Sequence, residues 1–513
     1  TIDDGTCLYS SFVFGCTDST SINYNPLATV DDSSCCGTAS QFWNQIGQDI
    51  DGEAAGDRSG EAISFNSNGN IVAIGAYGND GNGSDAGHVR IFENISNNWV
   101  QIGNDIDGSG PSYNSGYSLS LSNDGYTVAI GNASGSPEVK VYTWNGSSWN
   151  QKGQIISGYL SVSIVSLSTN GDTLAIGSSL TYNSSTNPGG RVQVFAFDGS
   201  SWLQLGQDIL GINAPYFWNA PLASDDFGYS ISLSSDGSIV AVGAPWNDDS
   251  GTDAGSVSVY SFDGSSWNQF GESSIVGDNA DDHFGWSVSL SNDGNRLAIG
   301  APNNDQQNTD GGHVRVYQLI NNPPNPPGWS QLGPNLIGED FGDNSGWSVS
   351  LSDDGNKVAI GAPGAGDTVW NSVVGHVRVY ELNSSTTAWN QLGQDIDGLV
   401  AGDKSGYSVS LNSDGNTVAS GAWNNGNNGS FAGTVRVYSM STPCNDLGCL
   451  DPLALNFDPN ATVSDSTCVY PIYGCIDTAA VNYNVLANTD DGSCTYCIYG
   501  CTDSLAINYD PLA

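Results

Sequence analysis

The residues whose spacing most clearly predicts chemistry are the cysteines. All eleven lie in the flanks of the chain, at positions 7–36 and 444–501, and the long central region contains none. Three flanking segments begin with Gly-Cys and reach a second cysteine 19 residues later, which predicts the disulfides Cys16–Cys35, Cys449–Cys468 and Cys475–Cys494. Segments this short cannot build a core, so a disulfide substitutes for one. Such usage predicts an oxidising, extracellular compartment.

Two further cysteine pairs are expected at the boundaries of these modules. A fourth copy begins at Gly500 and meets the last residue before its second cysteine, while the opening TIDDGTC would complete it. We expect Cys501 to pair with Cys7 of a neighbouring copy, in tandem or head to tail; an arbitrary cut through a longer chain is the alternative. A Cys36–Cys444 disulfide would close a loop of about 400 residues and contribute roughly 5 kcal/mol. Cys497 is left over, either free or cross-linked to another chain.

Acidic loops are the second candidate for chemistry. They follow three strand-like segments that end in Gly-Ala, and their carboxylates could hold Ca²⁺, which takes six to eight oxygen ligands. The alternative is turn chemistry, in which Asp and Asn side chains bond to their own backbone. The candidate ligands are Asp80, Asp85, Asp248, Asp249, Asp253, Asp305 and Asp310, with the module pairs Asp31-Asp32 and Asp490-Asp491 as further candidates.

Three of the four histidines share one register, Gly-His-Val-Arg, at His88, His313 and His376. Repetition at one strand position indicates a structural role, and we expect an Asp–His tether between strands with Asp57, Asp282 and Asp343 as partners. No catalytic constellation stands out, so the chain is expected not to be an enzyme. Trp246 lies in a loop beside Asp248 and is a candidate for stacking on a sugar.

Charge restricts the partners of the chain. Asp and Glu number 54 against 11 Lys and Arg, giving a net charge of −43. Such a chain repels phosphate, which argues against a nucleic-acid partner. No run of 18 apolar residues exists, so membrane insertion is not expected. Asn-x-Ser/Thr sequons are candidate glycosylation sites, although this composition also produces them by chance: Asn82, Asn94, Asn132, Asn145, Asn183, Asn383, Asn428 and Asn460.

The central region must supply the elements that carry these residues, and three strand-like signatures recur there seven times. One is a Trp segment such as WNQLGQDI, one a hairpin such as VSLSNDGNRLAIGA, and one an alternating strand such as HVRVY. The Trp segments begin at Trp43, Trp99, Trp149, Trp202, Trp267, Trp329 and Trp389. The Asp-Gly and Asn-Gly pairs of the hairpins predict tight primed turns, in which both central residues need positive φ.

Seven units of four antiparallel strands predict a seven-bladed β-propeller in an all-β chain. The region opens with a Trp segment and closes with an alternating strand near Val435. We therefore expect the segment at Trp43 to supply the outer strand of the last blade, which would close the ring.

A family resemblance supports this fold. The stretch FGYSISLSSDGSIVAVGAP, residues 227–245, resembles the FG-GAP repeat of integrin-α-type propellers, and Phe284-Gly285 with Gly300-Ala301-Pro302 repeats the pattern. The resemblance implies seven blades. Integrin-type repeats also carry a calcium loop, Asp-x-Asp-x-Asp-Gly, where this chain has only Ser-Asp-Gly or Asn-Asp-Gly. The flanks resemble Cys- and Asp-rich tandem repeats of secreted marine bacterial and algal surface proteins.

The expected organisation is an all-β, seven-bladed propeller with small disulfide-tied modules at both ends. The segments are the end of a preceding module and linker (1–14), a module (15–36), the propeller (37–443), two modules (444–473 and 474–499) and part of another (500–513). The expected function is a structural subunit of an extracellular filament or surface appendage, with further copies of the chain as partners. The alternative is a cell-surface adhesin or lectin-like propeller that binds glycans or a protein. Ca²⁺ is the one candidate cofactor.

Overall fold

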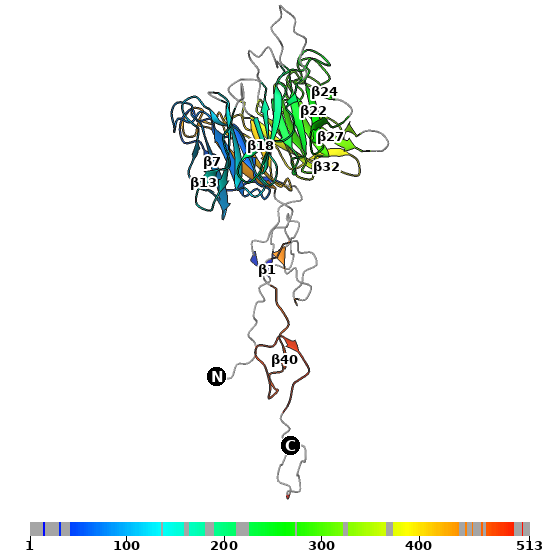
Figure 1. Cartoon of the computed structure of the whole chain (residues 1–513). Helices are drawn as coiled ribbons and strands as arrows, with labels where there is room; N and C mark the ends of the chain where they lie inside the picture. The colour runs from blue at the N-terminus through cyan, green and yellow to red at the C-terminus, as the bar shows by residue number, and fades with distance from the viewer. Residues whose placement is uncertain are drawn as a thin grey trace, which may run out of the picture. The chain divides into compact units, whose positions relative to one another are not determined.

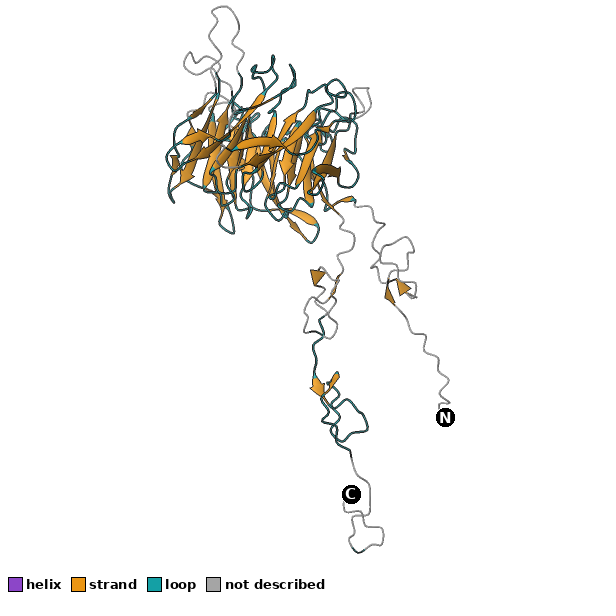
Figure 2. Cartoon of the chain, turned by 90° about the vertical axis from the view of Figure 1, so that its right-hand side faces the viewer, coloured by secondary structure: helices purple, strands orange, loops and turns teal. Residues whose placement is uncertain are grey.

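A computed structural model of the chain describes residues 42–440, except 135–136, 158–163, 180–188, 212–224, 272–273, 322–326 and 366–372, together with 468–496 and the short pieces 14–15, 30–31, 447–448, 454, 463–464 and 505. The chain divides into two units, of which Gln41–Met440 is one and the two flanks form the other. All regular elements among the described residues are strands, as Figure 2 shows. None of these residues forms a helix long and apolar enough to cross a membrane.

The larger unit consists of seven antiparallel sheets, each of five strands (Figure 1). The innermost strands are β5 (Ala62–Phe65), β10 (Ser115–Leu121), β15 (Ile164–Leu167), β20 (Ser230–Leu233), β25 (Ser287–Leu290), β30 (Ser348–Leu351) and β35 (Ser408–Leu411). The second strands, nearly all buried, are β6 (Ile71–Ala76), β11 (Thr127–Asn132), β16 (Thr173–Ser178), β21 (Ile239–Ala244), β26 (Arg296–Ala301), β31 (Lys357–Ala362) and β36 (Thr417–Ala422).

The outer half of each blade is built on one long third strand. These strands are β7 (His88–Ile95), β12 (Glu138–Trp144), β17 (Arg191–Phe197), β22 (Ser256–Phe262), β27 (His313–Ile320), β32 (His376–Asn383) and β37 (Thr434–Met440). The Trp segments pair with them as β8 (Asn98–Gln101), β13 (Trp149–Gln151), β18 (Trp202–Gln204), β23 (Trp267–Gln269), β28 (Gly328–Gln331), β33 (Ala388–Gln391) and β3 (Trp43–Gln45). A fifth strand of two residues, not expected from the sequence, then pairs with the same third strand: β9 (Ile106–Asp107), β14 (Ile156–Ser157), β19 (Ile209–Leu210), β24 (Ile275–Val276), β29 (Leu336–Ile337), β34 (Ile396–Asp397) and β4 (Ile50–Asp51).

The predicted ring closure is confirmed. The segment at Trp43 pairs with β37 in the register Trp43↔Met440 and Gln45↔Tyr438, and β4 pairs with the start of the same strand. The last blade therefore combines the first and last strands of the propeller. The innermost strands of successive blades contact one another all the way round, with β35 meeting β5. Apolar clusters fill the spaces between neighbouring blades, so no blade buries both of its faces alone.

The hairpin turns differ from the prediction. In the turn Ser234–Ser238, Gly237 donates its N–H to the Ser234 carbonyl at 2.9 Å, and Gly237 has φ of 71° while Asp236 is not among the residues with positive φ. This is a type I turn closed by a left-handed glycine, not a primed turn with two left-handed centres. The aspartate instead caps the turn, because Asp236 Oδ1 accepts the N–H of Ser238.

Two rings of hydrogen bonds tie the inner strands together. In one, a serine hydroxyl of each inner strand accepts a backbone N–H of the next blade at 2.9–3.1 Å; the serines are Ser64, Ser120, Ser166, Ser232, Ser289, Ser350 and Ser410. In the other, one turn residue per blade donates its N–H to the carbonyl of the next at 2.9–3.0 Å, in the closed order Ser67, Asn123, Thr169, Ser235, Asn292, Asp353, Ser413 and back to Ser67. The turn ends of the inner strands are therefore joined into one continuous belt.

The seven repeated tryptophans form a third ring at the outer rim. Each donates its indole N–H to a backbone carbonyl of the preceding blade, for example Trp389 to Leu332 at 2.8 Å and Trp43 to Leu392 at 2.8 Å. The other five do the same at 2.8–3.2 Å: Trp99, Trp149, Trp202, Trp267 and Trp329. A buried N–H that is satisfied in this way stabilises the outer blade contacts.

The two glycines of the repeated motif meet across six of the blade boundaries among the described residues. The carbonyl of Gly346, which has φ of 92°, would lie 2.0 Å from a Cβ on Gly300 of the preceding blade. The carbonyl of Gly406 stands in the same way against Gly361, at 1.9 Å. Any side chain at either of these second-strand glycines would push the blades apart. At these boundaries the close contact between blades therefore requires glycine.

In the flanks, three modules share one local structure. Each described strand pair is parallel and two residues long: β1 (Phe14–Gly15) with β2 (Val30–Asp31), β38 (Leu447–Gly448) with β39 (Val463–Ser464), and β40 (Tyr473–Gly474) with β41 (Thr489–Asp490). The predicted Cys475–Cys494 disulfide is present, with Cα atoms 4.8 Å apart. Cys468 is also disulfide-bonded. The other cysteines for which the sequence predicts a role lie outside the described residues: Cys7, Cys16, Cys35, Cys36, Cys444, Cys449, Cys497 and Cys501.

Candidate functional site

At one position near the start of the inner strands, the blades place large, mostly aromatic side chains around the propeller axis. In six blades it follows a left-handed glycine that precedes or opens the inner strand, at the end opposite the belt of turns. In the described blades it is occupied by Glu61, Tyr117, Tyr229, Trp286, Trp347 and Tyr407. All six side chains are half-buried. Because the inner strands surround the axis, the fold brings these residues from six blades to one place.

These side chains contact one another in sequence. Ring centroids are 4.9 Å apart for Tyr229 and Trp286, 4.7 Å for Trp286 and Trp347, and 5.3 Å for Trp347 and Tyr407. Such separations with tilted rings are typical of favourable aromatic pairs. Tyr407 then contacts Trp423, at 5.8 Å, in the loop after β36.

A basic side chain connects the Trp423 end of this row to two further tyrosines. The guanidinium of Arg58 lies 5.5 Å from the ring of Trp423 and 5.1 Å from that of Tyr77, and Tyr77 contacts Tyr117 at 5.6 Å. Arg58 also donates a hydrogen bond to the Tyr77 hydroxyl. We call the set the axial aromatic cluster; its members are Arg58, Glu61, Tyr77, Tyr117, Tyr229, Trp286, Trp347, Tyr407 and Trp423.

The one carboxyl group of the cluster has an altered proton affinity. Burial raises the pKa of Glu61 from 4.5 to about 7, although Arg58 and the Tyr407 hydroxyl both favour the charged form. The Tyr407 hydroxyl lies 3.5 Å from Glu61 Oε1. Burial and the carboxyl of Glu61 raise the pKa of Tyr407 well above its usual range. Near neutral pH the phenol of Tyr407 is therefore uncharged and the carboxyl group of Glu61 is about half protonated.

The cluster extends toward one of the acidic loops. Trp246, singled out from the sequence as an isolated loop residue, makes an edge contact with Tyr229 at 5.1 Å and lies 5.7 Å from Trp286. His283 packs against Trp246 at 5.5 Å, and burial lowers the pKa of this histidine. Trp246 is half-buried and belongs to a continuous aromatic surface.

The cluster tryptophans differ from those of the outer rim in their hydrogen bonding. Among the described residues, no hydrogen-bond acceptor lies at the indole N–H of Trp286, Trp347 or Trp423, and that of Trp423 is buried. Every rim tryptophan, in contrast, donates to a carbonyl. Buried polar groups are normally hydrogen-bonded, so these indoles retain unused donor capacity.

The acidic loops have the geometry of turns. Asp80, Asp248 and Asp305 each accept the N–H of a residue five positions later at 2.8 Å, namely Asp85, Asp253 and Asp310. The three donor residues have φ of 51–53°. This is the alternative weighed from the sequence, in which the carboxylates cap their own backbone. Asp249 is exposed and donates its N–H to Asn247.

The groups of three possible metal ligands in the described part of the chain lie elsewhere. They are Glu53, His88 and Asp105, and His376, Asp395 and Asp397, with ligand atoms within 4.8 Å of one another. An arginine accompanies each group: Arg90 lies 3.7 Å from Glu53, and burial together with Arg378 lowers the pKa of His376. A guanidinium beside the ligands opposes a second cation, so neither group is suited to a metal ion.

The expected histidine tethers are wrong in their partners. Asp57 and Asp343 each accept two backbone N–H groups of their own loops at 2.8–3.0 Å. Asp282 accepts the side-chain amide of Asn304 at 2.8 Å. These carboxylates are therefore occupied as loop caps.

The histidines face a different residue or none. Nδ1 of His88 lies 3.8 Å from Asp105, and Nδ1 of His376 lies 4.0 Å from Asp395. His313 has no hydrogen-bond partner at either ring nitrogen among the described residues, because Asn335 stands where the other two blades have an aspartate. Burial and Arg315 lower the pKa of His313 to about 3.

The sequons differ widely in accessibility. Asn82, Asn145, Asn383 and Asn428 are exposed and Asn94 is half-buried. Asn132 is only 2% exposed, and its side-chain amide donates to the Ser134 carbonyl, an arrangement that disfavours a glycan there. Asn183 and Asn460 lie outside the described residues.

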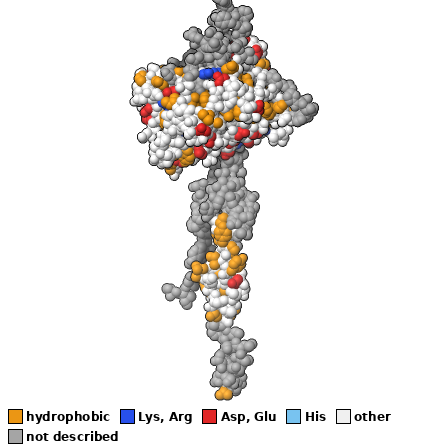
Figure 3. Space-filling view, in the orientation of Figure 1, with side chains coloured by type: hydrophobic (Ala, Val, Ile, Leu, Met, Phe, Trp, Pro, Cys, Tyr) orange, Lys and Arg blue, Asp and Glu red, His pale blue; other side chains and the backbone are white. Residues whose placement is uncertain are grey.

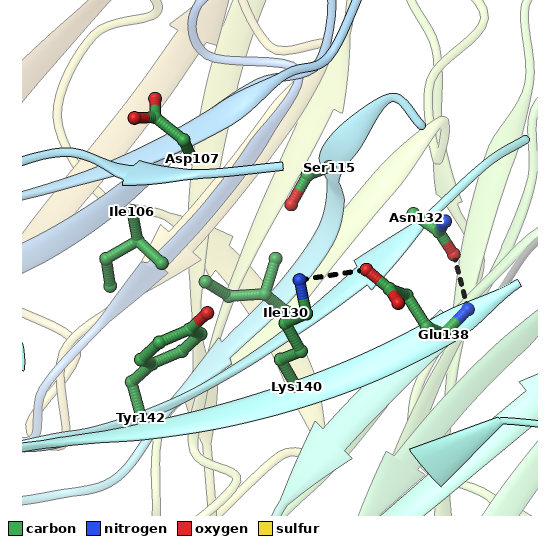
Figure 4. Close-up of a pocket in the computed structure, with 8 residues that line it drawn as sticks. All are labelled: Ile106, Asp107, Ser115, Ile130, Asn132, Glu138, Lys140 and Tyr142. Carbon is green, nitrogen blue, oxygen red and sulfur yellow. Dashed lines mark hydrogen bonds and ion pairs between the residues drawn. The ribbon is translucent and has the colours of Figure 1, made fainter. Parts of the chain in front are cut away.

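A small pocket lies at the side of the second blade. It is lined by Ile106, Asp107, Ser115, Ile130, Asn132, Glu138, Lys140 and Tyr142, and Figure 4 shows the Lys140–Glu138 ion pair within it. The two charges are 2.9 Å apart and neutralise each other. Its volume is about 10 Å³, room for one water molecule and no larger ligand.

Comparison with known proteins supports the propeller assignment. The model of the FG-GAP repeat matches residues 221–260 and 276–317, which include β20, β21, β25 and β26 and most of β22 and β27. No curated protein matches the chain. Among solved structures, the β-propeller domain of Myceliophteria thermophila Cps50 (Swd1) is 12% identical with a TM-score of 0.49, covering 77% of this chain and 99% of that one.

A second solved structure is a Bacteroides uniformis protein that carries the name 6-phosphogluconolactonase. It is 13% identical with a TM-score of 0.45, and the match covers 67% of this chain and 86% of that one. Similarities this remote carry no functional argument, and the count of seven blades rests on the strand pairing of this chain. FG-GAP repeats are typical of extracellular and surface proteins. The chain thus carries FG-GAP repeats on a seven-bladed β-propeller.

Proposed function

We propose that the chain is an extracellular attachment protein, in which the propeller is the binding head and the disulfide-tied modules are spacers. The observation that carries this proposal is the axial aromatic cluster. The serine ring, the belt of turns and the rim tryptophans already join neighbouring blades around the ring. None of these contacts includes a side chain of the axial aromatic cluster. Half-buried aromatic side chains that are not needed for closure are the residues expected at a binding surface.

The proposal includes the absence of catalysis. The cluster has one carboxyl group and one guanidinium, without a nucleophile positioned against a base. Its function would be recognition of a glycan or a protein on another surface. This fits the side-chain set, since tyrosine, tryptophan and arginine dominate recognition surfaces.

The experiment is a binding screen with the full chain. Labelled protein is applied to glycan arrays and to cells, and compared with a double variant, Trp286→Ala with Trp347→Ala. Leu203→Ala is the matched control, because Leu203 is 55% exposed on β18, at the outer rim. Binding that the double variant loses and the control keeps supports the proposal. Absence of binding to every surface, or equal binding by both variants, would contradict it.

A second candidate function is a subunit of an extracellular filament. The observation that favours it is the common parallel strand pair of three flanking modules, one of them closed by the Cys475–Cys494 disulfide. Repeated units stiffened in this way suit a connector that carries load. Electron microscopy of the native assembly tests it: propellers at regular spacing along a fibre would support this role, and isolated particles would exclude it.

A further inference from the structure

We propose that the axial aromatic cluster binds a neutral saccharide. This inference rests on the proposed function, because it names the ligand of the binding head. The argument uses three properties of the cluster: the faces of its rings, its free hydrogen-bonding groups and its charge.

The rings provide a surface suited to sugar. A pyranose has a face of aliphatic C–H groups that carries slight positive charge, and the face of an indole or phenol is slightly negative. Tyr229, Trp286, Trp347 and Tyr407 form an unbroken row of such rings with contacts of 4.7–5.3 Å. Trp246 lengthens the row on one side, 5.1 Å from Tyr229. A row of this length favours an oligosaccharide over a single sugar.

The polar groups of the cluster suit hydroxyl ligands. A sugar hydroxyl both donates and accepts a hydrogen bond, so it is matched by a mixture of donors and acceptors. The indole N–H groups of Trp286 and Trp347 are available as donors among the described residues. The carboxyl of Glu61 and the hydroxyl of Tyr407, 3.5 Å apart, can each donate or accept. A purely apolar partner would leave the two indole N–H groups without hydrogen-bond acceptors, which opposes its binding.

Charge decides between neutral and ionic ligands. Arg58 already occupies the cation position over the rings of Tyr77 and Trp423, so a second cation would meet like charge there. An acidic sugar would approach a chain with a net charge of −43, and Figure 3 shows acidic side chains scattered over the propeller surface with few basic ones. The only basic residue of the cluster, Arg58, is paired with the Tyr77 hydroxyl. A neutral ligand avoids both penalties.

The test compares three classes of probe on the full chain. Neutral hexose and N-acetylhexosamine oligosaccharides, sulfated or uronic acid oligosaccharides, and a trimethyllysine peptide are titrated by calorimetry against wild type, Trp347→Ala, Trp347→Phe and Leu203→Ala. We expect a neutral oligosaccharide to bind, Trp347→Ala to weaken it roughly tenfold or more, and Trp347→Phe to retain most of the affinity. The Leu203→Ala variant should bind as wild type does.

The outcomes separate this inference from the proposed function. Preference for the acidic sugars or the methylated peptide, with loss in Trp347→Ala, overturns the saccharide assignment and leaves the binding head intact. Neutral sugar binding that Trp347→Ala retains overturns the placement at the cluster. Binding of no probe and of no surface in the screen above overturns both. Near-ultraviolet circular dichroism and unfolding midpoints of each variant establish that a lost affinity is not a lost fold, and Trp347→Phe reports on the site even where the alanine variant unfolds.

Discussion

Replacement of Glu61 by glutamine should stabilise the propeller in alkaline solution and leave it almost unchanged in acid. The folded protein raises the pKa of Glu61 from 4.5 to about 7, mainly through burial. Between these two values the folded state binds more protons than the unfolded state, so stability falls as the pH rises through this window. Well above pH 7, Glu61 is ionised in both states, and the full cost of burying its charge lowers the free energy of unfolding. The glutamine side chain has the same shape and no charge to bury.

The magnitude follows from the two pKa values. Their difference corresponds to about 3 kcal/mol at pH 8, and to less than about 0.3 kcal/mol at pH 4. For an unfolding unit of about 400 residues, 3 kcal/mol is equivalent to a rise in Tm of about 3–4 °C. The glutamine variant also loses the attraction between Glu61 and Arg58. The pKa of about 7 already includes this attraction, because Arg58 lowers the pKa of Glu61 by less than burial raises it.

The assay is urea unfolding of the full chain and the variant at pH 4 and pH 8, followed by tryptophan fluorescence. The control is Glu381→Gln, since Glu381 is exposed and lies 3.9 Å from Lys357, a surface pair that contributes less than about 1 kcal/mol at any pH. A Glu61→Gln variant that is less stable than wild type at pH 8, or shifted equally at both pH values, would refute the placement of this carboxyl group in a desolvated cluster.

Three further predictions concern the histidines, the rim and the loops. The folded protein lowers the pKa of His313 from 6.5 to about 3, so the unfolded state binds a proton first and the free energy of unfolding falls as the pH drops below 6.5. The loss is about 2 kcal/mol at pH 5, and His313→Thr should remove it in urea titrations. Trp389→Phe should destabilise by about 1–3 kcal/mol, because it leaves the Leu332 carbonyl unpaired, whereas Trp347→Phe should cost less in the same unfolding measurement. Asp248→Asn should change the unfolding midpoint little, because the amide oxygen of asparagine can also accept the Asp253 N–H. EDTA should likewise change the midpoint little, and a large drop with EDTA would instead indicate bound metal.

The sequence predicted the propeller because each blade repeats the same physical requirements. The outer strand at Trp43 could be assigned to the last blade, because the region opens with a Trp segment and closes with an alternating strand near Val435. The fifth strands were not expected, because two residues such as Ile50–Asp51 carry no periodic pattern. The turn type was wrong because Asp-Gly is compatible with two geometries, and in the type I turn Asp236 accepts hydrogen bonds from the Ser234 hydroxyl and the Ser238 N–H.

The site was harder to predict than the fold. Trp286 and Trp347 were passed over because the tryptophan count was dominated by the regular rim positions, and only Trp246 stood apart. The signal was an aromatic residue directly after the glycine in Ser/Phe-Gly-Tyr/Trp-Ser, as in Gly285-Trp286 and Gly346-Trp347. This signal could not be recognised from the sequence, because the aromatic residues are about 60 positions apart and come together only when the blades close into a ring. The partners of the histidines were wrong for a different reason, since the partner of His88 is Asp105, next to the fifth strand of the same blade, and the fifth strands were not expected.

The repeats themselves separate structural from functional positions. The rim tryptophan, the inner-strand serine and the motif glycine serve the same contact in blade after blade, and their identity is fixed by hydrogen bonds or by lack of space. The axial position obeys no such rule, because it is Glu61 in one blade, Tyr407 in another and Trp347 in a third. A position that varies among copies with identical backbones is not determined by ring closure. A recognition surface needs such asymmetry, since an asymmetric ligand requires a donor, an acceptor and a ring face at different points around the same axis.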